Sequence, residues 1–238
     1  MKNFKEILTE GLYDPGIFKA FFLPGGPGSG KTFVTRNVFG GTGLKVVNSD
    51  RALESSLKKV NLSLQMPPEE EYFRDMIRQK AKLTTASQLD KYVEGRLGLV
   101  IDATARDIEL IKSQHQNLSG LGYDCYMIFV NTSLEVALER QKGRERQVPE
   151  YIVTNSWNKI QGNMGKLQNI FGMNNFIVVD NNKSQQELVT ATMNKVSKMV
   201  NSLIKKPVKS YIAKRWMATE RKARRRRWRI LNLLEISY

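Results

Sequence analysis

The sequence is poor in cysteine and histidine, with one residue of each among 238. A single cysteine cannot build a disulfide framework, which favours a reducing compartment. Cys125 lies in an apolar run, so we interpret it as a core residue. His115 lies in the polar stretch 112–117, which is typical of a solvated helix face. Zinc catalysis by histidines and a Ser-His-Asp triad are therefore disfavoured.

Long hydrophobic runs are also missing. No segment approaches the roughly eighteen apolar residues that span a bilayer. Residues 1–13 mix Lys2, Lys5, Glu6 and Glu10 and lack the apolar centre of a signal peptide. We therefore expect a cytoplasmic protein with no membrane partner.

Acidic residues are scarce relative to basic ones, and the formal net charge is +15. The excess is concentrated at the end of the chain, where residues 201–238 hold 12 Lys and Arg against two Glu. The segment is expected to be either a helix or a disordered arm. Arginines interleaved with Trp216 and Trp228 suit phosphate contacts and base stacking, so contact with nucleic acid or another anionic surface through this tail is one hypothesis. A solvated basic extension is the alternative.

The most informative segment is GGPGSGKT, residues 25–32, which fits the phosphate-binding pattern G-x-x-x-x-G-K-[ST] and follows an apolar run. Its glycines let successive N–H groups face phosphate oxygens, and the following helix adds its positive dipole end. We expect Lys31 to reach the β- and γ-phosphates of ATP and the Thr32 hydroxyl to ligate Mg²⁺. The predicted nucleotide-binding residues of the loop are Gly25, Gly28, Ser29, Gly30, Lys31 and Thr32. An ordinary glycine-rich turn is the alternative.

Apolar runs alternate with helix-like stretches, which is typical of βαβ units. The expected strands are residues 18–23, 44–48, 99–102, 125–131 and 176–180. We predict an α/β P-loop NTPase fold with a five-stranded, mostly parallel sheet and helices on both faces. The expected helices outside the insert and the tail are residues 33–39, 134–141, 149–166 and 185–205.

The chain divides by composition into a catalytic domain, residues 1–205, and a basic tail, residues 206–238. The polar insert 51–98 is broken at Pro67 and Pro68 and contains a helix predicted over 69–82. It would overhang the carboxyl edge of the sheet, where ligands bind in open α/β folds, so we interpret it as a substrate cap.

Two carboxylates follow predicted strands. Asp50 comes after the second strand, and we expect that strand to lie next to the phosphate loop. We predict Asp50 as the general base that accepts the proton of a substrate hydroxyl; it could also cap a helix starting at Arg51. Asp102 ends the third strand and is predicted to hold Mg²⁺ or position the substrate, with Thr104 as a donor. A turn-forming aspartate is the alternative for Asp102.

A cluster of cations at residues 140–146 lies within a predicted lid, residues 140–149. Charge that builds up on a transferring phosphoryl group needs cations delivered after the substrates bind. We predict Arg144 and Arg146 as lid arginines and Arg140 as a nucleotide contact. A solvated basic turn is the alternative.

Five segments taken in order resemble the zeta-toxin and polynucleotide-kinase group of P-loop kinases: GGPGSGKT, VVNSD, LVIDATARD, FVNTSLEVALER and RERQVPEYIV. The match spans residues 17 to about 182, and the whole is also similar to zeta-toxin-like kinases of tailed bacteriophages. If the protein is phage-encoded, we expect it in the host cytoplasm. The resemblance implies that the Asp102 strand lies beside the phosphate-loop strand. It also implies ATP-Mg²⁺ as donor and a hydroxyl as acceptor.

One departure bears on the acceptor. Members that act on polynucleotide 5′-hydroxyls or amino-sugar nucleotides commonly carry an arginine three positions after the catalytic aspartate, where this chain has Leu53. Arg51 lies two residues away, which turns its direction along a helix by about 200°. We therefore predict an ATP-dependent kinase with a nucleotide-like or small-molecule acceptor. The alternatives are a 5′-hydroxyl polynucleotide kinase, a P-loop ATPase acting as motor or switch, and a nucleotide-binding module without turnover.

Overall fold

The computed structural model describes residues 11–65, 67–103, 105–144, 148–182 and 186–235. Within these ranges the strands are β1 (Lys19–Pro24), β2 (Lys45–Val47), β3 (Leu99–Ala103), β4 (Asp124–Asn131) and β5 (Phe176–Asp180). The helices are α2 (Lys31–Phe39), α3 (Ser49–Lys59), α4 (Glu71–Glu94), α5 (Ile108–Gly120), α6 (Leu134–Lys142), α7 (Glu150–Phe171), α8 (Gln186–Lys205) and α9 (Tyr211–Glu235). Short 3₁₀ turns, η1 (Pro68–Glu70) and η2 (Met173–Asn175), precede α4 and β5.

The five strands form one sheet in the order β2-β3-β1-β4-β5, and every strand pair is parallel. Each predicted strand matches the observed one to within a residue at either end. The prediction succeeds because strands covered on both faces read as continuous apolar runs, and every residue of β1 is buried. The predicted α/β fold with a parallel sheet is confirmed.

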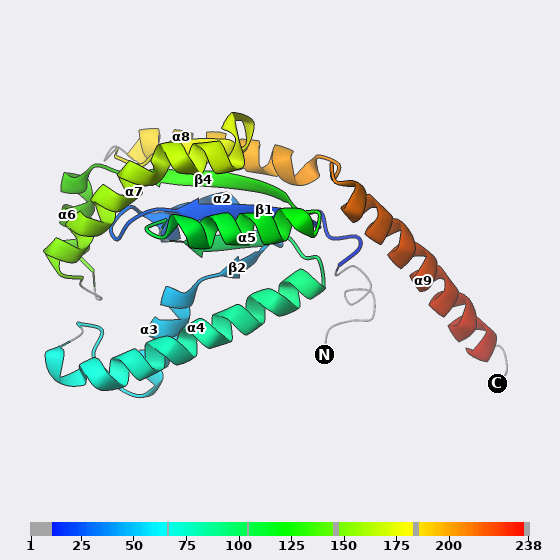
Figure 1. The fold of residues 1–238 in the computed structure, drawn as a ribbon, viewed down its shortest axis with the longest axis horizontal. Helices are drawn as coiled ribbons and strands as arrows, with labels where there is room; N and C mark the ends of the chain where they lie inside the picture. Colours follow the sequence, from blue (N-terminus) through cyan, green and yellow to red (C-terminus); the bar gives the residue numbers. More distant parts are fainter. Residues whose placement is uncertain (1–10, 66, 104, 145–147, 183–185, 236–238) are drawn as a thin grey trace.

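Helices cover both faces of the sheet (Figure 1). On one face, α5 and α7 pack against Ala20 and Phe22 of β1. On the other face, α2 and α8 pack against Phe21 and Leu23. Because side chains alternate along a strand, each face of β1 supplies its own apolar cluster.

The predicted insert forms a pair of packed helices, α3 and α4, with a small apolar cluster of its own. Leu53, Leu57, Leu64 and Ala81 are the buried members of this cluster. The helix predicted over 69–82 runs to Glu94, because no glycine or proline interrupts it. Leu89, Tyr92 and Val93 in its last turns pack against the cluster under α5 and α7, which anchors the pair to the body.

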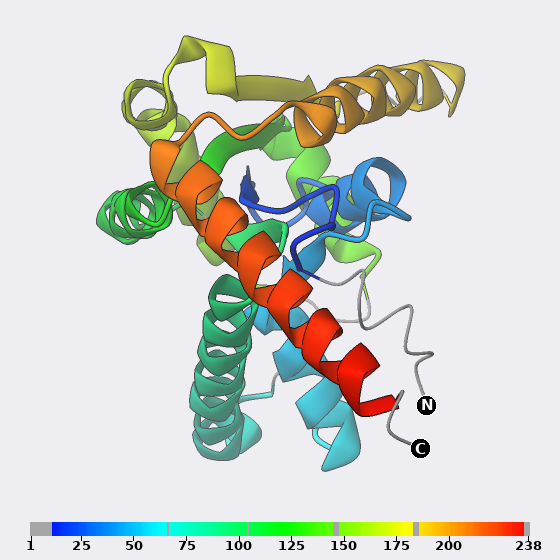
Figure 2. The same cartoon turned by 90° about the vertical axis from the view of Figure 1, so that its right-hand side faces the viewer.

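The first half of the basic tail packs on the body as part of α9 (Figure 2). Ala213 is fully buried, and the ring of Trp216 contacts that of Phe18 edge-on at 5.5 Å between centroids. Phe18 immediately precedes β1, so α9 begins at the amino-terminal edge of the sheet and runs away from it (Figure 1). The segment was expected to be either a helix or a disordered arm, and the structure shows a helix over Tyr211–Glu235.

His115 differs from the prediction. Its ring is half-buried and contacts Phe171 of α7 at 4.5 Å between centroids, and burial lowers the pKa of His115. The polar stretch was misleading because His115 follows Ile111 by one helical turn and shares its inward face. Cys125 is buried, as predicted. None of the described helices combines the length and the apolar character that a membrane span requires.

Candidate active site

The predicted phosphate loop connects β1 to α2. Gly28 and Gly30 adopt left-handed backbone conformations, with φ of 79° and 87°. A Cβ on Gly28 would overlap the backbone of Ala137 in α6, and one on Gly30 would overlap the side chain of Asn181. Only glycine fits both the conformation and the close approach at these two positions.

Two side chains at the ends of neighbouring strands brace the loop. The Ser29 carbonyl accepts hydrogen bonds from Thr132 Oγ1 at 3.1 Å and Asn181 Nδ2 at 2.7 Å. Thr132 follows β4 and Asn181 follows β5, and both are buried. Trp157 Nε1 in turn donates to the Thr132 carbonyl at 2.7 Å. These residues were not predicted from the sequence, although Thr132 and Asn181 are polar side chains directly after two apolar strands.

Lys31 opens α2 and is held inside the curve of the loop. Its ammonium donates to the carbonyl of Gly25 at 2.5 Å and to that of Gly26 at 3.4 Å. It also lies 4.0 Å from Asp102 Oδ1, and both side chains are largely buried, with 13% and 9% exposed. The first N–H groups of α2 have no partner within the helix, so they add hydrogen-bond donors and a positive dipole end at this point.

Asp102 joins Lys31 because β3 lies directly beside β1, with Asp102 opposite Leu23 in the register. This is the arrangement that the family resemblance implied. Asn48 Nδ2 donates to Asp102 Oδ2 at 2.5 Å. Burial raises the pKa of Asp102 to about 6, the Lys31 ammonium lowers it, and the Asp50 carboxylate raises it further. Asp50 is therefore within electrostatic range of Asp102.

Asp50 lies exposed in the first turn of α3. Two expectations about it are wrong. The strand that leads to it is not next to β1, because β3 lies between them and β2 pairs with β3. The helix begins at Ser49, and its cap is Asn48, whose Oδ1 accepts from the Arg51 amide at 2.9 Å. The role of Asp50 as a base stays a prediction.

The predicted cations differ in position. Arg140 in α6 lies beside the loop, with its Nη1 3.7 Å from where a Cβ on Gly30 would lie. Among the described residues, Arg140 Nη1 and Ser29 Oγ are buried without a hydrogen-bond partner. Arg144 is exposed just after α6, and Thr32 is exposed in the first turn of α2. Arg146 and Thr104 lie outside the described residues.

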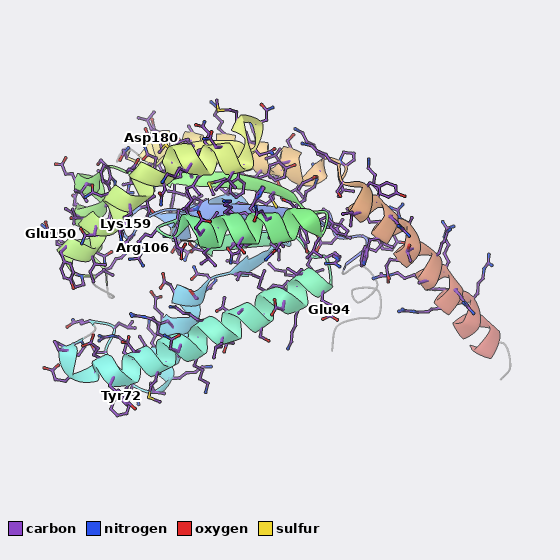
Figure 3. The ribbon with its side chains drawn as sticks, in the orientation of Figure 1. Tyr72, Glu94, Arg106, Glu150, Lys159 and Asp180 are labelled. Carbon is purple, nitrogen blue, oxygen red and sulfur yellow. The ribbon has the colours of Figure 1, made fainter. Side chains whose placement is uncertain are left out.

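Further residues near this edge were not predicted. Arg106 follows β3, and its Nη1 donates to Ser156 Oγ of α7 at 3.3 Å. Figure 3 shows Arg106 and Lys159 on the side of α5 and α7, facing the part of the molecule where Tyr72 lies on α4. Leu53, at the position where related kinases carry an arginine, is 2% exposed and packs inside the α3–α4 cluster. The Leu53 side chain therefore stabilises the packing of α3 against α4.

The comparisons with known proteins agree with this fold. A family model described as an AAA domain matches residues 21–167. No curated protein matches the sequence. The AvrRxo1-ORF1:-ORF2 complex is 13% identical with a TM-score of 0.52, covering 81% of this chain and 71% of that one. The same complex with ATP is 15% identical with a TM-score of 0.50, covering 70% of this chain and 57% of that one.

The PezAT toxin-antitoxin system of Streptococcus pneumoniae is 19% identical, with a TM-score of 0.49, and the match covers 79% of this chain and 88% of that one. At such identities the likeness to the two AvrRxo1 structures shows the fold alone. That fold is an α/β P-loop kinase-like fold. The resemblance to bacteriophage kinases stays a prediction.

Proposed function

The chain belongs to the AAA domain family, and we propose that it is an ATP-dependent kinase that transfers the γ-phosphoryl group of ATP to an alcohol. One observation carries this proposal. A loop in which Gly28 and Gly30 adopt left-handed conformations leads into the N-terminus of α2. There the Lys31 ammonium lies 4.0 Å from the Asp102 carboxylate, at the carboxyl edge of a parallel sheet. Ligands of open α/β sheets bind at this edge.

The residues around the loop fit a triphosphate. Ser29 Oγ and Arg140 Nη1 are buried polar atoms without a partner among the described residues. Buried polar atoms are normally hydrogen-bonded, and phosphate oxygens would satisfy a hydroxyl and a guanidinium alike. The loop amides, Lys31 and Arg140 would hold the phosphates.

The residues also fit Mg²⁺. The ion is usually held by one or two carboxylates together with substrate phosphates, rather than by a cage of protein ligands. The described residues include no cluster of three or more His, Cys, Asp or Glu, which agrees with that mode. Thr32 and Asp102 would hold the ion. When bound, Mg²⁺ would neutralise charge on the phosphates.

In the proposed reaction, the acceptor hydroxyl oxygen bonds to the γ-phosphorus as the bond to the bridging oxygen of ADP breaks. Asp50 accepts the hydroxyl proton, and Lys31, Arg144 and Arg146 stabilise the developing charge. Lys159 and Arg106 are both exposed and add positive charge at the same edge, which suits a nucleotide-like acceptor.

A second candidate is a 5′-hydroxyl polynucleotide kinase, which the basic helix α9 favours. That helix begins at the amino edge of the sheet, whereas the phosphate loop follows the carboxyl end of β1 (Figure 1). An oligonucleotide contacting both would have to cross the length of the sheet. This candidate therefore requires a long strand rather than a short one.

The experiment is incubation with γ-labelled ATP and a panel of nucleosides, sugar nucleotides, and short and long 5′-hydroxyl oligonucleotides, followed by mass analysis of the products. We expect one class to gain a phosphate as ADP forms, and Asp50→Asn to lose this product. Phosphate transfer to long oligonucleotides alone would favour the second candidate. Phosphate release with no phosphorylated acceptor would identify an ATPase, and no ATP consumption would identify a binding module. Either of the last two results contradicts the proposal.

A further inference from the structure

A cavity of about 470 Å³ lies at the amino edge of the sheet, away from the phosphate loop, between the end of α8 and the first turns of α9. Its apolar lining includes Ile17, Val208 and Met217. Its cationic lining consists of Lys19, Lys205, Lys206, Lys214 and Arg221, and none of the described residues that line it is acidic. Lys19 is paired with Asp124 at 2.6 Å, so the other four cations set the charge of this groove.

Positively charged side chains also extend along helix α9, away from the groove. Its inner face packs through Ala213, Trp216 and Met217, and Glu220 on that face is paired with Arg224 at 3.2 Å. Glu220 is the one acidic residue between positions 211 and 229. The exposed cations of α9 are Lys214, Arg215, Arg221, Lys222, Arg225, Arg226, Arg227 and Arg229.

This arrangement of cations favours the binding of a polyanion. Like charges one turn apart repel each other, so a helix that gathers them without acidic neighbours keeps an unneutralised surface. A helix of 25 residues is about 37 Å long, enough to follow many phosphates of one strand. An anionic membrane fits less well, because an interfacial helix inserts a free apolar face. In the first turns of α9, Ala213, Trp216 and Met217 already pack on the body of the protein.

Two features favour a single strand over a duplex. Trp228 is 53% exposed and lies three and seven residues after Arg225 and Arg221, on the same side of the helix. An exposed indole beside arginines is a platform for an unpaired base. The groove offers apolar walls to a base and cations to its phosphate. A duplex keeps its bases inside and would use neither feature.

We propose that the α8–α9 groove and the exposed face of α9 bind single-stranded nucleic acid. The contact goes beyond the proposed kinase activity, because it lies at the opposite edge of the sheet from the phosphate loop (Figure 1). Binding can therefore fail while phosphoryl transfer to a small acceptor persists, and the reverse also holds.

The test is fluorescence anisotropy with a labelled oligothymidine and the full chain, titrated at several salt concentrations. Lys214→Gln/Arg221→Gln removes two cations of the groove. The matched control Lys195→Gln/Lys198→Gln removes two exposed lysines of α8 that do not line it. We expect the groove variant to bind at least about tenfold more weakly and to lower the salt slope by about 1.4, since each single-strand phosphate contact contributes about 0.7. The control should stay within about twofold.

Trp228→Ala separates stacking from charge. Because the side chain is exposed, the fold should persist, which circular dichroism checks. We expect about tenfold weaker binding with an unchanged salt slope, a loss within the range that stacking of one base on an aromatic side chain contributes. Equal losses in the groove and control variants, tighter binding of duplex than of single strand, or a preference for phosphatidylserine vesicles over oligothymidine would each overturn the proposal.

Discussion

At the residue scale, Asp102 holds a carboxylate in surroundings that oppose its charge. Burial raises its pKa from 3.8 to about 6, and Asp50 adds to the shift against the opposing effect of Lys31. The folded protein then binds a proton more readily than the unfolded chain. The stability that this contributes is fully present below about pH 3.8 and is lost as the pH rises through about 6.

We therefore expect Asp102→Asn to stabilise the fold at neutral pH, by up to about 3 kcal/mol, because one pKa unit corresponds to about 1.4 kcal/mol. The gain should shrink toward acid, where Asp102 itself is neutral. Urea unfolding in metal-free buffer near pH 4 and above pH 7 measures it. A gain that does not change with pH, or a loss at neutral pH, would contradict this account of Asp102.

Asp50→Asn should abolish transfer and leave ATP affinity nearly intact, because Asp50 is proposed to act on the acceptor proton alone. General-base catalysis typically contributes about 10²- to 10⁴-fold in rate. Single-turnover transfer and calorimetric ATP binding, measured side by side, check both parts. Unchanged turnover would remove Asp50 from the mechanism.

Lys31→Ala should weaken ATP binding and transfer together, because Lys31 is proposed to contact the phosphates in both the ground and the transition state. We expect a loss of several kcal/mol of transition-state stabilisation. The control Lys195→Ala removes an exposed lysine of α8. If both variants retain ATP affinity, Lys31 does not contact the nucleotide.

The motif residues could be predicted from the sequence, but the side chains that hydrogen-bond to them were missed. Lys31 is identified by a spacing pattern, and strand ends pointed to Asp102. Asn48, Thr132 and Asn181 also follow predicted strands, but the groups that they contact lie on another strand or on the loop and are identified only once these segments converge. Leu53 could be read from sequence as a departure from related kinases, but its burial in the α3–α4 cluster could not.

At the element scale, the phosphate loop is pressed against α6. Gly28→Ala adds a Cβ that would meet the Ala137 backbone and forces an alanine into the left-handed region. The conformation alone costs roughly 1–2 kcal/mol, and a shift of α6 adds to it. Gly162→Ala is the matched control: it lies inside α7 with nothing within 4 Å of the new Cβ.

We expect Gly28→Ala to lower the free energy of unfolding and ATP affinity, and Gly162→Ala to raise the free energy of unfolding by about 0.5–1 kcal/mol, as alanine is favoured in helices. Chemical denaturation of both variants makes the comparison. Equal effects at the two positions would mean that the loop does not require its glycines.

The bounds of the strands were well predicted from their apolar runs, but the position of the second strand in the sheet was not. The run 44–48 indicates a strand and says nothing about the intervening β3, which depends on pairing between distant segments. The last turns of α4 were not predicted, although no glycine or proline interrupts them, because Leu89, Tyr92 and Val93 pack against the cluster under α5 and α7, a tertiary contact that the polar sequence around them does not reveal.

At the scale of the whole molecule, the division into residues 1–205 and a tail stays a prediction, and α9 bears on how to test it. Val208 and Ala213 are buried, and Trp216 packs on Phe18. A chain ending at residue 206 should lose a few kcal/mol of stability, because it exposes this apolar surface. A chain ending at residue 224 should keep the fold and lose most nucleic-acid affinity. Thermal unfolding and anisotropy of the two truncations test this, and equal stability would show that α9 adds nothing to the core.

A crystal structure of the protein with a non-hydrolysable ATP analogue and Mg²⁺ tests the kinase proposal most directly. We predict a triphosphate along the amides of residues 27–32, Lys31 Nζ at the β- and γ-phosphates, and Asp50 facing the γ-phosphate. A nucleotide bound elsewhere, for instance in the α8–α9 groove, with the phosphate loop making no contact to it, would contradict the kinase proposal.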